Sequence, residues 1–253
     1  MLNLMDNKWH LPPTPLLLLS SLWLLFSVPL VAQQPSNQYR LKGLVEVKAR
    51  ILTTDPFGNI YVANEKNELE KFNSDGQKLY WYNENLHGPI SYVDATNPLK
   101  VLVHYKDYST VVVLDNTLTQ KSVIRLLDHG YLQVNALCLA LDNNIWIYDE
   151  ITFRLKKLDP NLNVVSQSED LSTQLGITLQ PNFMRERDGY LWVNDPTQGI
   201  LMFDLFGTYY KTIPLLGLTS FQKMGDQIIY FKDGQLHTYH LKTLQQKTIA
   251  MPA

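Results

Sequence analysis

The sequence has almost no cysteine. Cys138 is the only one among 253 residues, so an intramolecular disulfide is impossible and a disulfide-built scaffold is excluded. It lies in the apolar stretch Ala136–Ala140, where a lone thiol is expected to be a small, inert core residue. Because no cysteine lies near the end of the amino-terminal apolar run, anchoring through an acylated cysteine is excluded as well.

Charge is also scarce and nearly balanced. Charged residues make up 18% of the chain, the formal net charge is −2, and the sequence shows no cluster of Lys and Arg. An electrostatic attachment to nucleic acid or to anionic lipid depends on such a basic excess. We therefore expect neither a nucleic-acid partner nor a lipid surface.

Motifs that carry chemistry are missing too. The sequence has no Gly-x-Ser-x-Gly, no phosphate-binding glycine loop and no calcium-loop pattern, which argues against the common hydrolase and nucleotide-binding classes. None of the six histidines stands at a metal-ligand spacing from Cys, Asp or Glu. The best pair, His237 and His240, would point to opposite faces of a strand. We predict no catalytic residue, no metal and no cofactor, and hence a protein that is not an enzyme.

The amino terminus is typical of an export signal. Lys8 precedes an apolar run from Leu16 to Val31 that ends in the sequence Leu30-Val31-Ala32-Gln33. A membrane-spanning helix needs about 20 apolar residues, and this run is shorter and interrupted by Ser and Pro. We predict a signal peptide over residues 1–32, in preference to a permanent anchor, and a mature domain over residues 33–253 that resides in the periplasm.

One sequence pattern recurs along the predicted mature chain. In each copy, turn residues precede a short apolar strand, a polar turn and a second strand. Gly, Asn and Asp tolerate the positive φ of tight hairpins, and strands that are apolar at every position are typical of sheets covered on both faces. Three clear copies and two degraded copies occupy residues 55–64, 141–149, 187–195, 97–103 and 225–231.

The spacing of these copies predicts a β-propeller. The steps between Ile60, Val101, Ile145, Leu191 and Ile228 are 41, 44, 46 and 37 residues, within the range of propeller blades. We predict an all-β propeller of five four-stranded antiparallel blades, with six blades as the alternative. An open ring would leave a sheet edge with unpaired backbone groups. We therefore expect the segment Tyr39–Ile51 to add a strand to the last blade.

Two of the copies resemble known repeats. Residues Asp55–Asn64 resemble the repeat of NHL-type and lactonase-like propellers, and Asp188–Asn194 resembles the blade signature of two-component-regulator propellers. With its leader ending in Ala32-Gln33, the chain also resembles the small periplasmic propellers of Bacteroidota, one of which plugs the outer-membrane translocon of type 9 secretion. This resemblance implies a protein-binding subunit of an outer-membrane secretion or transport complex, and it assigns no residue.

Two alternative functions stay open. A metal-dependent, lactonase-like hydrolase would gather Asp, Asn and Glu ligands at the central channel. A sensor module would bind a glycan or small ligand, and the sequence indicates no site for it. Asn and Asp at strand ends also simply satisfy turn backbone groups, and we favour that interpretation. The residues at suitable strand ends are Glu46, Asn64, Asn135, Asp149, Asn194 and Asp195.

Two aromatic clusters are the most suggestive surface feature. Tyr80, Trp81 and Tyr82 lie in a predicted outer strand, and Tyr209 and Tyr210 lie in another. Tyr and Trp often anchor protein interfaces because they combine a large apolar area with a polar tip. We therefore predict that these five residues bind the partner, with packing between blades as the alternative.

Overall fold

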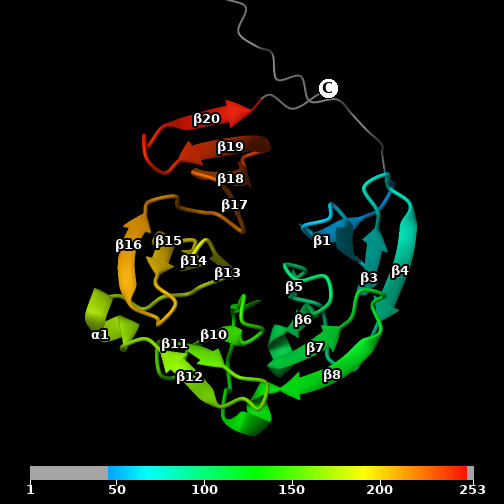
Figure 1. The fold of residues 1–253 in the computed structure, drawn as a ribbon, viewed down its shortest axis with the longest axis horizontal. Helices are drawn as coiled ribbons and strands as arrows, with labels where there is room; N and C mark the ends of the chain where they lie inside the picture. The colour runs from blue at the N-terminus through cyan, green and yellow to red at the C-terminus, as the bar shows by residue number, and fades with distance from the viewer. Residues whose placement is uncertain (1–44, 250–253) are drawn as a thin grey trace, which may run out of the picture. The chain divides into compact units, whose positions relative to one another are not determined.

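The computed structural model describes residues 45–249, which form five small antiparallel sheets. Each sheet has four strands, hydrogen-bonded in the order in which they follow along the chain. The sheets lie around a common centre as the blades of a propeller (Figure 1). The predicted fold of five four-stranded blades is confirmed, and the alternative count of six is not. The predicted signal peptide, residues 1–32, lies outside the described residues.

The blades follow the chain in order. Blade 1 contains β1 (Ala49–Thr54), β2 (Ile60–Asn64), β3 (Glu68–Phe72) and β4 (Lys78–Asn83). Blade 2 contains β5 (Tyr92–Asp94), β6 (Val101–Tyr105), β7 (Thr110–Leu114) and β8 (Gln120–Arg125). Blade 3 contains β9 (Leu137–Leu139), β10 (Ile145–Asp149), β11 (Arg154–Leu158) and β12 (Val164–Gln167). Blade 4 contains β13 (Phe183–Arg187), β14 (Tyr190–Asp195), β15 (Gly199–Phe203) and β16 (Tyr209–Ile213). Blade 5 contains β17 (Gln222–Met224), β18 (Gln227–Lys232), β19 (Gln235–His240) and β20 (Gln246–Ile249).

Helical structure is limited to short connections. These are the 3-10 turns η1 (Lys106–Tyr108) and η2 (Leu126–His129) and the five-residue helix α1 (Leu171–Leu175), which Asp170 caps by accepting from the backbone of Ser172 and Thr173. Within residues 45–249 there is no helix of the length and hydropathy needed to cross a membrane.

The second strand of each blade carries most of the core. Trp146 and Trp192, at matching positions of β10 and β14, are almost fully buried. Successive residues of such a strand point to opposite faces, so Ile145 and Ile147 pack toward blade 2 while Trp146 packs toward blade 4. The uninterrupted apolar pattern thus fills the two junctions on either side of a blade.

Aspartate side chains hold the turns between the third and fourth strands. In blade 2, Asp115 accepts hydrogen bonds from the backbone N–H of Thr117 and Thr119 at 2.9 and 3.0 Å. Asp159 and Asp204 do the same in blades 3 and 4, each for the residues two and four positions later. This repeated turn satisfies backbone donors that the ladders leave free, and it fixes where each outer strand begins.

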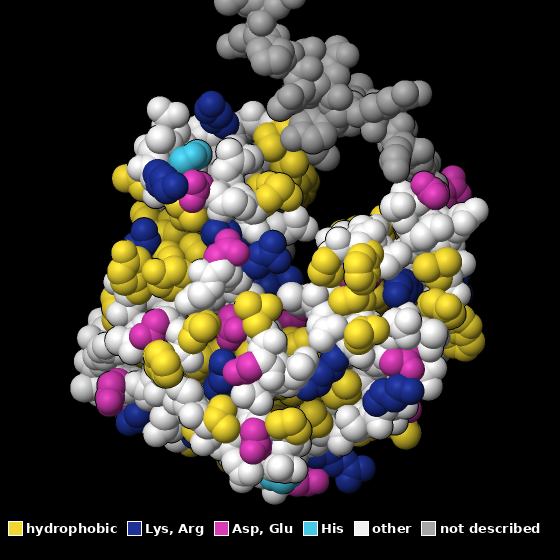
Figure 2. Space-filling view, in the orientation of Figure 1, with side chains coloured by type: hydrophobic (Ala, Val, Ile, Leu, Met, Phe, Trp, Pro, Cys, Tyr) yellow, Lys and Arg dark blue, Asp and Glu magenta, His cyan; other side chains and the backbone are white. Residues whose placement is uncertain are grey.

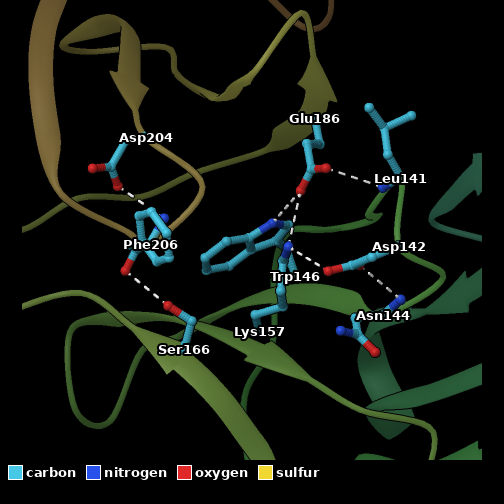
Figure 3. A network of polar contacts seen from close by, with 9 residues as sticks. All are labelled: Leu141, Asp142, Asn144, Trp146, Lys157, Ser166, Glu186, Asp204 and Phe206. Carbon is cyan, nitrogen blue, oxygen red and sulfur yellow. Dashed lines mark hydrogen bonds and ion pairs between the residues drawn. The ribbon is translucent and has the colours of Figure 1, made fainter.

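Polar contacts join blades 3 and 4 across their apolar junction (Figure 3). Glu186 of β13 is almost fully buried. Its two oxygens accept from the Trp146 indole N–H at 2.6 Å and from the Leu141 backbone N–H at 3.0 Å. Lys157 lies 3.5 Å from Glu186 and 2.8 Å from Asp142. Because this carboxylate is fully partnered on both sides, it positions the inner strand of blade 4 against blade 3.

Replacing Glu186 tests this contact. Glu186→Ala leaves the Trp146 and Leu141 N–H groups without their acceptor, while Lys157 keeps its ion pair with Asp142. We therefore expect a loss of about 2–4 kcal/mol in the free energy of unfolding, measured by urea denaturation. The matched control is Glu169→Ala, since that side chain is 83% exposed and lies 3.9 Å from Arg154. The control should cost less than about 1 kcal/mol, and equal losses in the two variants would contradict the assignment.

His104, in β6, is a second buried polar group. It has no exposed surface, and neither ring nitrogen has a hydrogen-bond partner in the described part of the chain. Burial, followed by the charge of Lys106, lowers the pKa of His104 to about 3. The folded protein therefore keeps this imidazole neutral while the unfolded chain protonates it below its ordinary pKa of 6.5. Stability due to this group falls as the pH drops from 6.5 toward 3.

His104→Leu should remove this part of the pH dependence. Between pH 7.5 and 5.0 we expect the wild-type protein to lose about 2 kcal/mol more free energy of unfolding than the variant, since each unit of pKa difference corresponds to about 1.4 kcal/mol. His129→Leu, at an exposed histidine, should retain the wild-type dependence. Identical pH dependence in wild type and His104→Leu would show that His104 is accessible to protons in the native state.

Candidate functional site

One junction between blades lacks a core. A cluster of buried apolar side chains fills each junction between consecutive blades from blade 1 to blade 5. Among the described residues no such cluster joins blade 5 to blade 1. Figure 2 shows a hollow between these two blades, with hydrophobic side chains on both of its sides. We call this opening the seam.

The expected strand that would close the ring is not found there. Blade 5 takes all four of its strands from the carboxyl-terminal part of the chain. Of the segment Tyr39–Ile51, residues 49–51 belong to β1, where Ile51 pairs with Ala63 of blade 1. The expectation is therefore wrong for the described part of that segment, and residues 39–44 lie outside the described residues.

The blade 5 wall of the seam is apolar and open to solvent. Ile228 and Tyr230 of β18 pack against blade 4, so Ile229 and Phe231 face the seam. Phe231 is 56% exposed and Met224 of β17 is 61% exposed. This wall thus has the residue types of a covered face, and no other part of residues 45–249 covers it.

The blade 1 wall is partly covered. Its face is built by a row of paired residues, Leu52, Val62, Glu70 and Trp81, which lie side by side on the four strands. Val62 is buried, whereas Leu52 and Trp81 are 63% and 62% exposed. Val45, which precedes β1, lies close to Gly76 in the turn between β3 and β4. A Cβ atom added at Gly76 would lie 3.0 Å from the Val45 side chain.

The five predicted aromatic residues are divided between different surroundings. Tyr82 packs on the core between blades 1 and 2, and Tyr209 packs edge-on against Phe203. Tyr80 is partly exposed on the blade 2 side of its sheet. Tyr210 is 60% exposed on β16, the outer strand of blade 4, and its ring lies 5.7 Å from that of Tyr190. Of the five, Trp81 is the one that the strand pairing places on the seam. Their role in binding stays a prediction.

The candidate metal ligands at strand ends mostly accept hydrogen bonds from the turns that follow them. The side-chain oxygen of Asn64 accepts from the backbone N–H of Lys66 and Glu68. Asp149 accepts from Ile151 N–H, from the Thr152 hydroxyl and from Lys156, each at 2.7–3.0 Å. These contacts lower the pKa of Asp149, although burial, the largest single effect, acts to raise it. Both side chains are thus occupied by structural contacts.

The remaining candidates are also dispersed. Asp195 accepts from the backbone of Thr197 and Gln180, and Asn194 donates to Asn182 and to the carbonyl of Leu218. Asn135 donates to Glu150, and Glu46 is exposed. In the part of the chain that the structure describes, no three His, Cys, Asp or Glu side chains form a group suited to a metal ion. His237 and His240 lie on opposite faces of β19, as predicted.

Cys138 is fully buried at the junction of blades 3 and 4. Burial is the main cause that raises the pKa of its thiol well above the ordinary value. Because a thiolate is the reactive form of cysteine, this side chain is an inert part of the core, as the sequence predicts.

The inner strands enclose a cavity of about 590 Å³ at the centre of the blades. It is lined by β1, β5, β13 and β17 and by the residues next to them, and it meets the seam at Leu52 and Met224. On the side of blade 3 the centre is filled, since Tyr92 of blade 2 reaches Met184 of blade 4 and packs edge-on against Phe183. The cavity is therefore the inner end of the seam.

Comparison with known proteins supports the fold. No protein-family model and no curated protein sequence matches the chain. The WD40 domain of Pan2 from Neurospora crassa superposes with a TM-score of 0.55 at 13% identity, covering 79% of this chain and 65% of that one. Virginiamycin B lyase from Staphylococcus aureus, bound to quinupristin, gives 0.56 at 13% identity over 80% of this chain and 69% of the lyase. A structure in a nidogen–laminin complex gives 0.60 at 12% identity over 78% of both chains.

At these identities the likeness shows a β-propeller and nothing of the site. The chain spans about two thirds of the Pan2 domain and of the lyase. The superposed structures include a lyase and a WD40 domain, so the fold alone does not distinguish an enzyme from a binding domain. The seam was missed at the sequence level because Ile229 and Phe231 have the composition of an internal blade strand.

A pair of neighbouring residues tests whether the seam is open in the free protein. Tyr230→Ala removes a buried ring between blades 4 and 5 and should cost about 3–5 kcal/mol in the free energy of unfolding. Phe231→Ala changes the next residue, which faces the seam, and should cost less than about 1 kcal/mol. Urea denaturation of the purified protein measures both, and a large cost for Phe231→Ala would mean that the seam is already covered.

Proposed function

We propose that this chain is an exported, non-enzymatic β-propeller that binds a protein partner through the seam, as a subunit of an outer-membrane secretion or transport complex. The proposal rests on β18, where both faces of the strand are apolar and one of them is exposed. Its sequence, Ile228-Ile229-Tyr230-Phe231, is apolar on both faces, but only the Ile228 and Tyr230 face is buried. An apolar face of this kind, kept on an exported protein, needs a cover.

A polypeptide suits this cover better than a small molecule. The two walls of the seam are faces of four-stranded sheets, and their exposed side chains stand on different strands: Leu52 on β1, Trp81 on β4, Met224 on β17 and Phe231 on β18. A partner segment with apolar side chains on both of its faces would bury all four. Trp and Phe at such positions have the character of interface anchors.

The export and complex parts of the proposal have a separate basis. They rest on the predicted signal peptide over residues 1–32, the absence of recognisable catalytic motifs and the resemblance to small periplasmic propellers. The mature domain over residues 33–253 would reside in the periplasm and be held at the outer membrane by protein contacts. Neither the lactonase-like hydrolase nor the glycan sensor is favoured by a particular observation.

Site-specific photocrosslinking in intact cells tests the proposal. A photoreactive phenylalanine analogue at position 231 or 81 should give an adduct with one outer-membrane protein of a secretion or transport complex, identified by mass spectrometry of the envelope fraction. The control positions are Leu127 and Tyr108, which are similarly exposed but lie on blade 2 and its connection. They should give no such adduct.

Three results would contradict the proposal. An adduct of twice the chain's own mass would identify a second copy as the occupant of the seam. The absence of any intermolecular adduct at positions 231 and 81 would leave the seam without a partner protein. Recovery of the full-length precursor in the cytoplasm would contradict export, whatever the crosslinks show.

A further inference from the structure

Arg185, on the inner strand β13, has a hydrogen-bond donor that nothing accepts. One terminal nitrogen donates to the Thr96 hydroxyl at 2.8 Å, and the guanidinium lies 5.6 Å from the centre of the Phe183 ring. The Nε atom is buried and has no partner among the described residues. An unmatched buried donor is costly and usually marks a place where a water molecule or a ligand belongs.

The carboxylates around Arg185 are already occupied. Asp94 accepts from Leu139 N–H at 2.9 Å and from the backbone and hydroxyl of Thr96. Asp55, which lines the cavity, accepts from Phe57, Asn59 and Tyr61. Within residues 45–249 no carboxylate lies within ion-pair distance of the Arg185 guanidinium. Thr96, which donates to Asp94 and accepts from Arg185, is the hydrogen-bonded link between the two.

Three further cations line the same cavity: Arg50, Arg187 and Lys223. Lys223 and Arg187 share one carboxylate, Asp188, and Arg187 Nε lies 3.6 Å from it. Arg50 donates to the neutral amide oxygen of Asn67 at 3.2 Å. Asp55 is the one carboxylate among the described lining residues. The cavity thus holds more cationic donors than anionic acceptors (Figure 2 shows Lys and Arg side chains near its mouth).

We propose that the central cavity binds an oxyanion, a carboxylate or a phosphate group, with Arg185 as its principal donor. The planar guanidinium offers N–H donors in a fork that matches such groups. A volume of about 590 Å³ falls within the usual range of ligand sites. Although burial opposes its charge, Tyr92 and Asp94 raise the pKa of Arg185 above its ordinary value, so the group is cationic at any physiological pH.

The oxyanion can be free or can belong to an acidic side chain of a polypeptide that enters through the seam. Isothermal titration calorimetry at constant ionic strength separates the two sources. The probes are inorganic phosphate, citrate and an eight-residue peptide of alternating Val and Glu. A peptide of the same length with Gln in place of Glu is the uncharged control. Thermal unfolding with each probe gives a second readout.

The expected result is saturable binding of an anionic probe that Arg185→Gln weakens by on the order of tenfold to a hundredfold, the effect of losing one charged hydrogen-bond partner. Arg185→Lys should give intermediate binding. Lys211→Gln, at an exposed residue of β16, should change nothing. If Arg185→Gln does not fold, Arg50→Gln at the exposed rim of the cavity replaces it, with a smaller expected loss.

The probes then identify the source. Binding of phosphate or citrate indicates a free oxyanion, and binding of the Glu peptide alone indicates a polypeptide carboxylate. The proposal is overturned if no anionic probe binds, if the Gln peptide binds as well as the Glu peptide and phosphate does not bind, or if Arg185→Gln binds like the wild type. Because the peptide lacks any partner's own sequence, these outcomes do not depend on the protein partner proposed for the seam.

Discussion

The structure depends on one requirement, which is that each blade needs apolar cover on both of its faces. A four-stranded sheet of about 20 residues cannot form a core alone, so a blade depends on packing against its neighbours. Blades 2, 3 and 4 have both neighbours, and most residues of their two central strands are buried. Blades 1 and 5 each have one, and their outer faces keep Leu52 and Phe231 exposed. Residues 45–249 leave this requirement unmet at the seam, and the proposed partner would meet it.

What the sequence predicts well is the part of the structure that depends on neighbouring residues. Gly58, Asn143 and Gly189 have positive φ at the turns where their residue types predict it. The apolar runs that follow them are the second strands of blades 1, 3 and 4, and the spacing between runs gives the blade count. Each of these features is encoded within about ten residues, so local patterns are enough to find them.

Relations between distant residues are what the sequence does not reveal. The pattern of β18 is the same whether its second face meets another blade, a partner or water, so the seam is invisible from composition. The contact of Arg185 with Thr96 joins residues 89 positions apart, and no motif announces it. The aromatic clusters show the same limit, because alternation along a strand places Trp81 and Tyr82 on opposite faces without showing which face is covered.

The contacts of the candidate metal ligands bear on the alternative of a metal-dependent hydrolase. Such an enzyme needs carboxylates and amides at the channel that are free of other partners, but Asp149 and Asn64 are engaged by their own turns. The centre is instead lined by cationic side chains, which repel a metal ion and attract an oxyanion. A cavity with a positive lining at the inner end of an apolar opening fits the proposed recognition of an acidic, partly apolar ligand.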